Sequence, residues 1–275
     1  MIDSHQHFWQ YCPEDYDWID DSMAMIRRDF GPADLQETAA GLGVMGSVAV
    51  QARQSLGESQ WLLDLATEST FVKGVVGWVP LADVQVGGYL DQLAAHAAFK
   101  GVRHVVQGES DPEFLARENF NTGIREVTSR DLVYDVLIKA PQLEASIDLV
   151  DRHPNQRFVL DHIAKPVVDG APPSPWRELI AQLGERPNVS CKFSGVVTEV
   201  PGEAWSPDLI EPYWDVVLNA FGPDRLMFGS DWPVCLVRSS YARWLNTVSL
   251  FGSKLSPDER ARVMGGTATA VYRLG

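Results

Sequence analysis

The sequence predicts a parallel α/β protein, and more specifically a (β/α)8 barrel. The chain has 275 residues, close to the roughly 250 that are typical of this barrel. Eight short runs rich in β-branched residues recur along the chain, with helix-like stretches between them. This alternation favours parallel strands joined by helices. The runs are apolar throughout rather than alternating, which is typical of strands buried on both faces.

The eight expected strands cover residues 1–7, 46–51, 72–80, 101–106, 132–138, 157–162, 188–193 and 226–231. Residues 60–69 and 89–99 carry apolar side chains at helical spacing. We expect one domain over residues 1–275, because no repeat or linker divides the chain, and we read residues 170–175 as a loop between a strand and a helix. A doubly wound open sheet is the alternative arrangement of the same elements.

Two helix starts stand out in the sequence. Asp111 followed by Pro112 is typical of an N-cap with proline in the first turn. Ser256 with Glu259 three residues later forms the pattern of a capping box. We expect the helix that follows Ser256 to run to about Tyr272 and to close the chain.

Charge and composition exclude several classes of partner. The net charge is −14 and the sequence pI is near 4.8, whereas nucleic acids and anionic membrane surfaces are bound by basic patches. No apolar stretch approaches the roughly 18 residues of a membrane helix, and the first residues do not resemble a signal peptide. The three cysteines are widely spaced, which is typical of reduced thiols. We therefore expect a soluble cytoplasmic protein that binds neither nucleic acid nor membranes; the sequence does not reveal its oligomeric state.

Polar residues gather where the expected strands end. In a barrel of this kind the active site lies at the C-terminal ends of the strands and in the loops that follow them. Four of the six histidines fall at these ends, together with several cations. The residues concerned are His5, His7, Gln51, Arg53, Trp78, Arg103, His104, Lys139, His162, Lys165, Lys192 and Asp231. Because charged groups are costly to bury, such a gathering indicates an active site.

The most specific of these signals is the pair His5 and His7. Residues two apart on a strand point the same way, so both imidazoles face one space. Such a pair can bind one divalent metal or hydrogen-bond one substrate group. Asp231 follows the last strand, where its carboxylate can bind a metal or take a proton from an attacking water. His162 can serve as a ligand or as an acid.

Other strand ends supply candidates for binding substrate. Arg103 and His104 are adjacent, so only one can point inward; we favour His104 at the substrate carbonyl, with Arg103 reaching in from the rim. Gln51, Arg53, Trp78 and Lys192 are candidates for contacts with substrate hydroxyls. Tryptophans near these ends can stack on a sugar face or simply pack. Schiff-base chemistry at Lys192 or Lys139 is an alternative, but it would leave the histidine pair unexplained.

Several segments together resemble a known family. They are His5–x–His7, Gly77-Trp78-Val79-Pro80-Leu81, Gly101-Val102-Arg103-His104, Leu160-Asp161-His162-Ile163-Ala164-Lys165-Pro166, Lys192-Phe193-Ser194-Gly195 and Phe228-Gly229-Ser230-Asp231-Trp232-Pro233. In this order the sequence resembles the amidohydrolase superfamily, in the branch of metal-dependent hydrolases that includes L-fuconolactonase and L-rhamnonolactonase-like enzymes. The resemblance spans nearly the whole chain but does not specify one sugar.

The resemblance implies a distorted (β/α)8 barrel that hydrolyses a sugar-acid lactone, such as L-fuconolactone in L-fucose catabolism, to the aldonate. In this interpretation Asp231 is the general base, and His162, His104 and Arg103 assist at the reacting centre. A single divalent metal, for which zinc is the ion we expect, would be held by His5, His7, His162 and Asp231. The fifth expected strand has no histidine and the fourth no bridging residue, so a two-metal site is not expected, and a metal-independent lactonase is the alternative.

Two other functions are compatible with the same residues. One is a metal-dependent decarboxylase of an unsaturated carboxylate, which related barrels with a first-strand His-x-His pair also provide. The other is a non-catalytic protein that binds sugar acids. The intact set of His5, His7, His162 and Asp231 argues against the second, because binding alone needs no general base.

Overall fold

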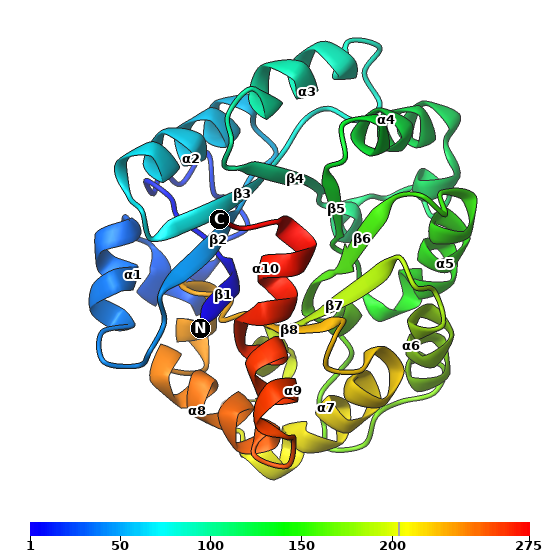
Figure 1. Cartoon of the computed structure of the whole chain (residues 1–275). Helices are drawn as coiled ribbons and strands as arrows, with labels where there is room; N and C mark the ends of the chain where they lie inside the picture. Colours follow the sequence, from blue (N-terminus) through cyan, green and yellow to red (C-terminus); the bar gives the residue numbers. More distant parts are fainter. Residues whose placement is uncertain (203) are drawn as a thin grey trace.

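The computed structural model describes residues 1–202 and 204–275, and within them eight parallel strands form one barrel (Figure 1). The strands follow one another around the barrel in chain order. They are β1 (Ile2–Gln6), β2 (Gly46–Val50), β3 (Val72–Gly77), β4 (Phe99–His104), β5 (Val133–Val136), β6 (Arg157–Leu160), β7 (Val189–Phe193) and β8 (Leu226–Phe228). The segment after β8 returns to β1, because the Asp231 N–H donates to the His5 carbonyl at 2.8 Å and the His7 N–H donates to the Trp232 carbonyl at 2.7 Å. The barrel prediction is confirmed, and the open sheet is excluded.

Helices surround the barrel and the last one closes it. The outer ring consists of α1 (Pro32–Thr38), α2 (Leu56–Glu68), α3 (Val86–Ala94), α4 (Glu118–Ser129), α5 (Leu143–Arg152), α6 (Trp176–Gly184), α7 (Pro207–Phe221) and α8 (Tyr241–Gly252). The chain then forms α9 (Pro257–Ala261) and α10 (Thr267–Tyr272), and α10 lies over the centre of the barrel in Figure 1. In the part of the chain that the structure describes, no helix is long and apolar enough to span a bilayer.

Most of the sequence-predicted elements are present, with three corrections. The expected helix over residues 89–99 ends at Ala94, because β4 already begins at Phe99. Asp111 does not start an α-helix: its carboxylate accepts the Glu113 N–H at 2.9 Å in a tight turn, and α4 begins only at Glu118. The Ser256 capping box is confirmed, but the closing helix is interrupted at Gly265, where φ is 158°.

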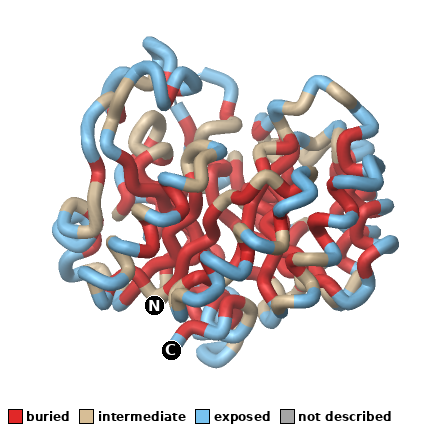
Figure 2. The backbone as a smooth tube through the Cα atoms, turned by 90° about the horizontal axis from the view of Figure 1, so that it is seen from above, coloured by how far each residue is buried: buried red, intermediate tan, exposed pale blue. Residues whose placement is uncertain are grey.

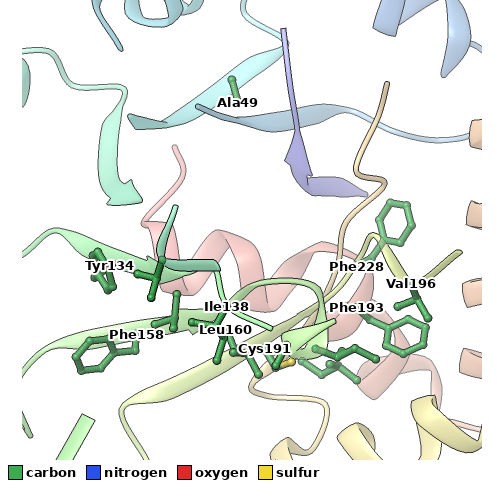
Figure 3. Close-up of a cluster of buried hydrophobic side chains, with 14 of the residues drawn as sticks. Ala49, Tyr134, Ile138, Phe158, Leu160, Cys191, Phe193, Val196 and Phe228 are labelled. Atoms are coloured by element: carbon green, nitrogen blue, oxygen red, sulfur yellow. The ribbon is translucent and has the colours of Figure 1, made fainter. Parts of the chain in front are cut away.

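The alternation of side chains along the strands creates two cores. Outward-facing side chains pack under the helix ring, and Figure 3 shows part of this outer core around Phe158, Leu160, Cys191 and Phe193. A smaller core fills the inside of the barrel; it consists of Val48, Val50, Val76, Val133, Val159 and Met227 from the strands with Ala268, Tyr272 and Leu274 from the C-terminal segment. Figure 2 shows the buried residues in the centre of the molecule, with both chain ends at the same edge of it.

The C-terminal segment covers the N-terminal end of the barrel, opposite the predicted active site. Leu274 lies against Gly74 near the start of β3, and the Lys100 ammonium bonds the Arg273 carbonyl at 3.2 Å near the start of β4. A Cβ at Gly265 would stand 2.8 Å from the Ile2 nitrogen, so the glycine permits the close approach of this segment to β1. The C-terminal ends of the strands are therefore the ends that remain for a substrate.

Candidate active site

The C-terminal strand ends bring three imidazoles around one carboxylate. The Oδ1 atom of Asp231 lies 3.3 Å from Nε2 of His7, 3.7 Å from Nε2 of His5 and 3.9 Å from Nε2 of His162. His5 and His7 project from the end of β1 and face each other at 3.2 Å through their Nε2 atoms. The four residues predicted as a unit from the sequence are thus close together in space. All of them are buried.

Asp231 is held as an ionised carboxylate. Burial by itself would raise its pKa, but the imidazoles around it outweigh that effect and lower the pKa below its ordinary value. Burial lowers the pKa of His162 to about 4, and it lowers the pKa of His5 well below the usual value. At neutral pH the site therefore contains a carboxylate that can accept a proton, next to the neutral imidazoles of His5 and His162.

The backbone around His162 is held in an unusual conformation. Residues 162–165 all have φ between 48° and 62°, in the left-handed region, and none of them is glycine. Such a conformation costs about 1–2 kcal/mol per residue, and strain of this kind concentrates at functional sites. The turn directs His162 Nε2 toward Asp231, while Nδ1 lies 2.9 Å from the Ser194 hydroxyl.

Gly195 leaves room for both groups. Its φ is +65°, and a Cβ there would stand 2.5 Å from Nδ1 of His162 and 2.9 Å from Oδ2 of Asp231. Any side chain at this position would therefore displace one of the two. The glycine at the end of the Lys192–Gly195 segment is explained by this contact.

Arg103, and not His104, points at the histidines. Its Nη1 atom lies 3.3 Å from Nε2 of His5 and donates to Oδ2 of Asp161 at 3.0 Å, and its Nη2 donates to the Gln51 carbonyl. The expectation that His104 faces inward is wrong, because β4 alternates and Gly101 and Arg103 take the inner positions. The sequence alone could not decide this, since a shift of one residue reverses the two faces of a strand.

His104 lies instead in a neighbouring cavity of about 340 Å³. Its Nδ1 accepts a hydrogen bond from Nε1 of Trp78 at 3.3 Å, its Nε2 lies 2.7 Å from Oε1 of Glu109, and its ring stacks on Phe114. Burial lowers the pKa of His104. The structure thus joins the predicted residues Trp78 and His104 in an aromatic-lined hollow at the ends of β3 and β4.

The other predicted residues have different surroundings. Gln51 is buried at the end of β2, where its Nε2 lies 3.4 Å from the Arg103 carbonyl and its Oε1 has no partner among the described residues. Arg53 is partly exposed and pairs with Asp15, with its guanidinium over the ring of Tyr16. Lys192 is fully buried inside the barrel.

Lys192 belongs to a charged group that sequence reasoning missed. Its Nζ lies 2.5 Å from Oδ2 of Asp135, 3.1 Å from Oδ1 of Asp161 and 3.2 Å from Nδ1 of His5. Asp135 in turn accepts a hydrogen bond from the Tyr272 hydroxyl. The sequence contains one signal for this group, the carboxylate of Asp135 in an otherwise apolar strand. A buried charge requires a partner, so this carboxylate predicts a cation nearby.

The donor set at the centre of the site is compatible with a metal ion. His5, His162 and Asp231 offer ligand atoms within 4.8 Å of one another, and imidazole nitrogen and carboxylate oxygen are donors that zinc accepts. His7 lies beside them; its Nδ1 is 2.8 Å from the Val50 carbonyl, which leaves Nε2 as the acceptor that faces the group. Arg103 lies against Nε2 of His5, so its positive charge would compete with a metal ion at that nitrogen.

The histidines at the end of the first strand and the aspartate after the last strand lie where (β/α)8-barrel enzymes have their active sites, so the fold and the site define an enzyme of this class. The chain belongs to the amidohydrolase family: the model of the family described as "Amidohydrolase" matches residues 2–274. The family expected from the sequence is thereby confirmed.

Three relatives extend this result. The chain is 37% identical to an L-fucono-1,5-lactonase of Burkholderia ambifaria, over 99% of this chain and 95% of that protein. It is 38% identical to an L-fucono-1,5-lactonase of Burkholderia multivorans, over 99% of this chain and 96% of that protein. A crystal structure of an amidohydrolase from Burkholderia multivorans with bound zinc superimposes with a TM-score of 0.94 at 39% identity, covering 100% of this chain and 99% of that one.

Proposed function

We propose that this protein is a lactonase that hydrolyses L-fucono-1,5-lactone, or a closely similar aldonolactone, to the open-chain acid. The observation that carries the proposal is the group of Asp231 with three imidazoles at the C-terminal end of the barrel. The full-length similarity to two L-fucono-1,5-lactonases supports the same substrate class. These relatives do not favour the decarboxylase or the pure binding protein.

Asp231 is the general base of the proposed reaction. Its ionised carboxylate takes a proton from a water molecule, whose oxygen bonds to the lactone carbonyl carbon. The tetrahedral intermediate then collapses: the bond to the ring oxygen breaks with its electron pair, and Asp231 returns the proton to that oxygen. The product is a hydroxy acid, which releases a proton above its own pKa. The Asp231 carboxylate is ionised before the water arrives and can therefore accept its proton, while its lowered pKa makes it a weaker base than an ordinary carboxylate.

The neighbouring donors would stabilise the charge that develops on the carbonyl oxygen. Arg103 offers a guanidinium fixed by Asp161 and the Gln51 carbonyl, and His162 offers an imidazole fixed by Ser194. Donors held in place in a buried site typically contribute a factor of about 10² to 10³ in rate. Arg103 and His162 are therefore our candidates for binding the oxyanion and orienting the water.

The sugar hydroxyls would be bound around this centre. Trp78 and His104 line the cavity next to the ends of β3 and β4. The buried Oε1 of Gln51 has no hydrogen-bond partner among the described residues, and Arg53 stands at the rim. We retain Gln51, Arg53 and Trp78 as candidates for substrate contacts and add His104, which lies in this cavity and not at the carbonyl. Lys192 is not among them, since its ammonium is enclosed by Asp135, Asp161 and His5.

A metal, where bound, would be held by His5, His162 and Asp231 with His7 beside them, and zinc is the ion that we propose. It would supply Lewis-acid polarisation of a bound oxygen. Arg103 can supply part of the same positive charge from the chain itself.

The test is a panel of 1,5- and 1,4-aldonolactones, with acid release followed in a weakly buffered solution, before and after dialysis against a chelator. We expect turnover of L-fucono-1,5-lactone well above spontaneous hydrolysis. Turnover that survives chelation indicates the metal-independent form, and turnover restored by zinc indicates the metal form. Absence of hydrolysis for every lactone, with zinc present, would refute the proposed function.

A further inference from the structure

Tyr272 reaches the inside of the barrel from the end opposite the active site. It is the last residue of α10, only 1% of its surface is exposed, and it belongs to the inner core with strand residues such as Val133 and Val159. Its hydroxyl lies 2.8 Å and 2.9 Å from the two carboxylate oxygens of Asp135. A phenol from the C-terminal helix therefore contacts a charge in the middle of the barrel.

Asp135 connects this phenol to Lys192. Asp135 projects inward from β5 and Lys192 projects inward from β7, and both are fully buried. The Lys192 ammonium has three N–H donors and three partners: Oδ2 of Asp135 at 2.5 Å, Oδ1 of Asp161 at 3.1 Å and Nδ1 of His5 at 3.2 Å. Its Nζ also lies 5.3 Å from the centre of the Tyr272 ring. With its donors directed at protein groups, Lys192 is positioned to hold His5 rather than a sugar hydroxyl.

His5 is the point where this chain of contacts meets the active site. Its Nδ1 faces Lys192 and Asp161, while its Nε2 faces His7, Arg103 and Asp231. The two nitrogens lie on opposite edges of one rigid ring, so the group that fixes Nδ1 also sets the direction of Nε2. Displacement of Asp135 or Lys192 would therefore rotate the ring against the carboxylate that we propose as the base.

We propose that Tyr272, Asp135 and Lys192 form a buried relay that positions the His5 imidazole from behind, and that Tyr272 is a positioning residue for the lactonase reaction. The relay rests on the proposed function for its effect on rate, but not for its effect on His5. It gives the C-terminal helix a role in the active site, although that helix lies at the opposite end of the barrel. It also explains why the Asp135–Lys192 pair is kept buried beside the apolar inner core, where ion pairs alone contribute little net stability.

The test variant is Tyr272→Phe, which removes one oxygen atom and keeps the ring that fills the inner core. Tyr213→Phe is the matched control. Tyr213 is also buried, but in the outer layer, and its hydroxyl donates to the Val167 carbonyl at 2.8 Å, so the substitution removes an equivalent hydrogen bond away from the relay. We expect Tyr272→Phe to lower kcat about tenfold with KM within twofold, because small misplacement of a reacting group acts on the transition state. We expect both kinetic constants of Tyr213→Phe to stay within twofold of wild type.

A second readout does not depend on activity. The ¹⁵N signals of the His5 ring, assigned by their loss in His5→Gln, should shift in Tyr272→Phe and stay unchanged in Tyr213→Phe at the same pH. A double-mutant comparison completes the test: in an Asp135→Asn background, Tyr272→Phe should have less than about a twofold effect, because the relay is already broken.

The outcomes separate this inference from the proposed function. If wild type hydrolyses no lactone, the proposed function fails, and the His5 signals still decide the relay. Unchanged His5 signals together with wild-type kcat in folded Tyr272→Phe would overturn the relay, as would full additivity with Asp135→Asn. If Tyr272→Phe does not fold, Asp135→Asn alone must reproduce the kcat loss and the His5 shift, and its failure to do so would overturn the relay equally.

Discussion

Replacement of Gly195 by alanine should slow the reaction on the order of 10²-fold while leaving the enzyme folded. The added Cβ would stand 2.5 Å from Nδ1 of His162 and 2.9 Å from Oδ2 of Asp231, distances that real Cβ atoms do not tolerate. The φ of +65° adds a backbone cost of about 1 kcal/mol for alanine relative to glycine. To relieve the contacts, His162 or Asp231 must move by roughly 1 Å, and misplacement of that size costs on the order of 10²-fold in rate.

The assay compares kcat/KM of Gly195→Ala with that of a second glycine variant. Gly43 also has a left-handed backbone, with φ of +76°, but a Cβ there would meet nothing within 4 Å. Gly43→Ala therefore has the same type of backbone cost without a contact in the site, and it should lose about 1 kcal/mol of stability with unchanged kinetics. If Gly195→Ala retains kcat/KM within threefold of Gly43→Ala, the packing of Gly195 against the two site residues is not functionally important.

Three further predictions concern stability and metal content. The pKa of Glu58 is raised from 4.5 to about 7, chiefly by burial; the folded state keeps a proton that the unfolded state releases in this range, so wild type should lose up to about 3 kcal/mol of stability as pH rises from 4.5 to 7 through this group. Urea unfolding at pH 5 and 7.5 should show that the free energy of unfolding falls more between these two pH values in wild type than in Glu58→Gln. Equal falls in the two proteins would contradict the prediction. Lys192→Met should destabilise by about 3–5 kcal/mol because it leaves buried carboxylates uncompensated, and Lys192→Met with Asp135→Asn should recover part of that loss; a double variant no more stable than the single one would argue against the pairing. Metal analysis should find no more than one zinc per chain, because the described residues offer a single suitable cluster of donors, and two bound ions would be inconsistent with it.

The fold and the centre of the site were accessible from the sequence because their signals are local. Apolar runs of strand length mark the barrel, and polar residues stand at or shortly after the ends of these runs, as His5 does within β1 and Asp231 does three residues after β8. The rule that such ends meet at one face of a barrel then brings distant residues together without any knowledge of contacts. The rule places His5, His7 and His162 at the same end of the barrel as Asp231, where the structure brings them together.

The parts that could not be predicted depend on long-range geometry. The choice between Arg103 and His104 is a matter of register, and the sequence carries both residues side by side. Lys192 pairs with Asp135, which is 57 residues away in the chain, and Asp135 in turn accepts a hydrogen bond from Tyr272 in the C-terminal helix. The left-handed turn that begins at His162 contains no glycine, the residue by which such a turn is usually predicted. Its conformation is therefore imposed by the surrounding fold.

The most direct test of the account is the turnover of L-fucono-1,5-lactone by Asp231→Asn. Asparagine keeps the size of the side chain but cannot accept the proton of the attacking water at neutral pH. We predict a fall in kcat of about 10³-fold, with a circular dichroism spectrum and thermal unfolding curve that still show a folded protein. A folded Asp231→Asn enzyme with turnover near that of wild type would contradict the assignment of Asp231 as the general base.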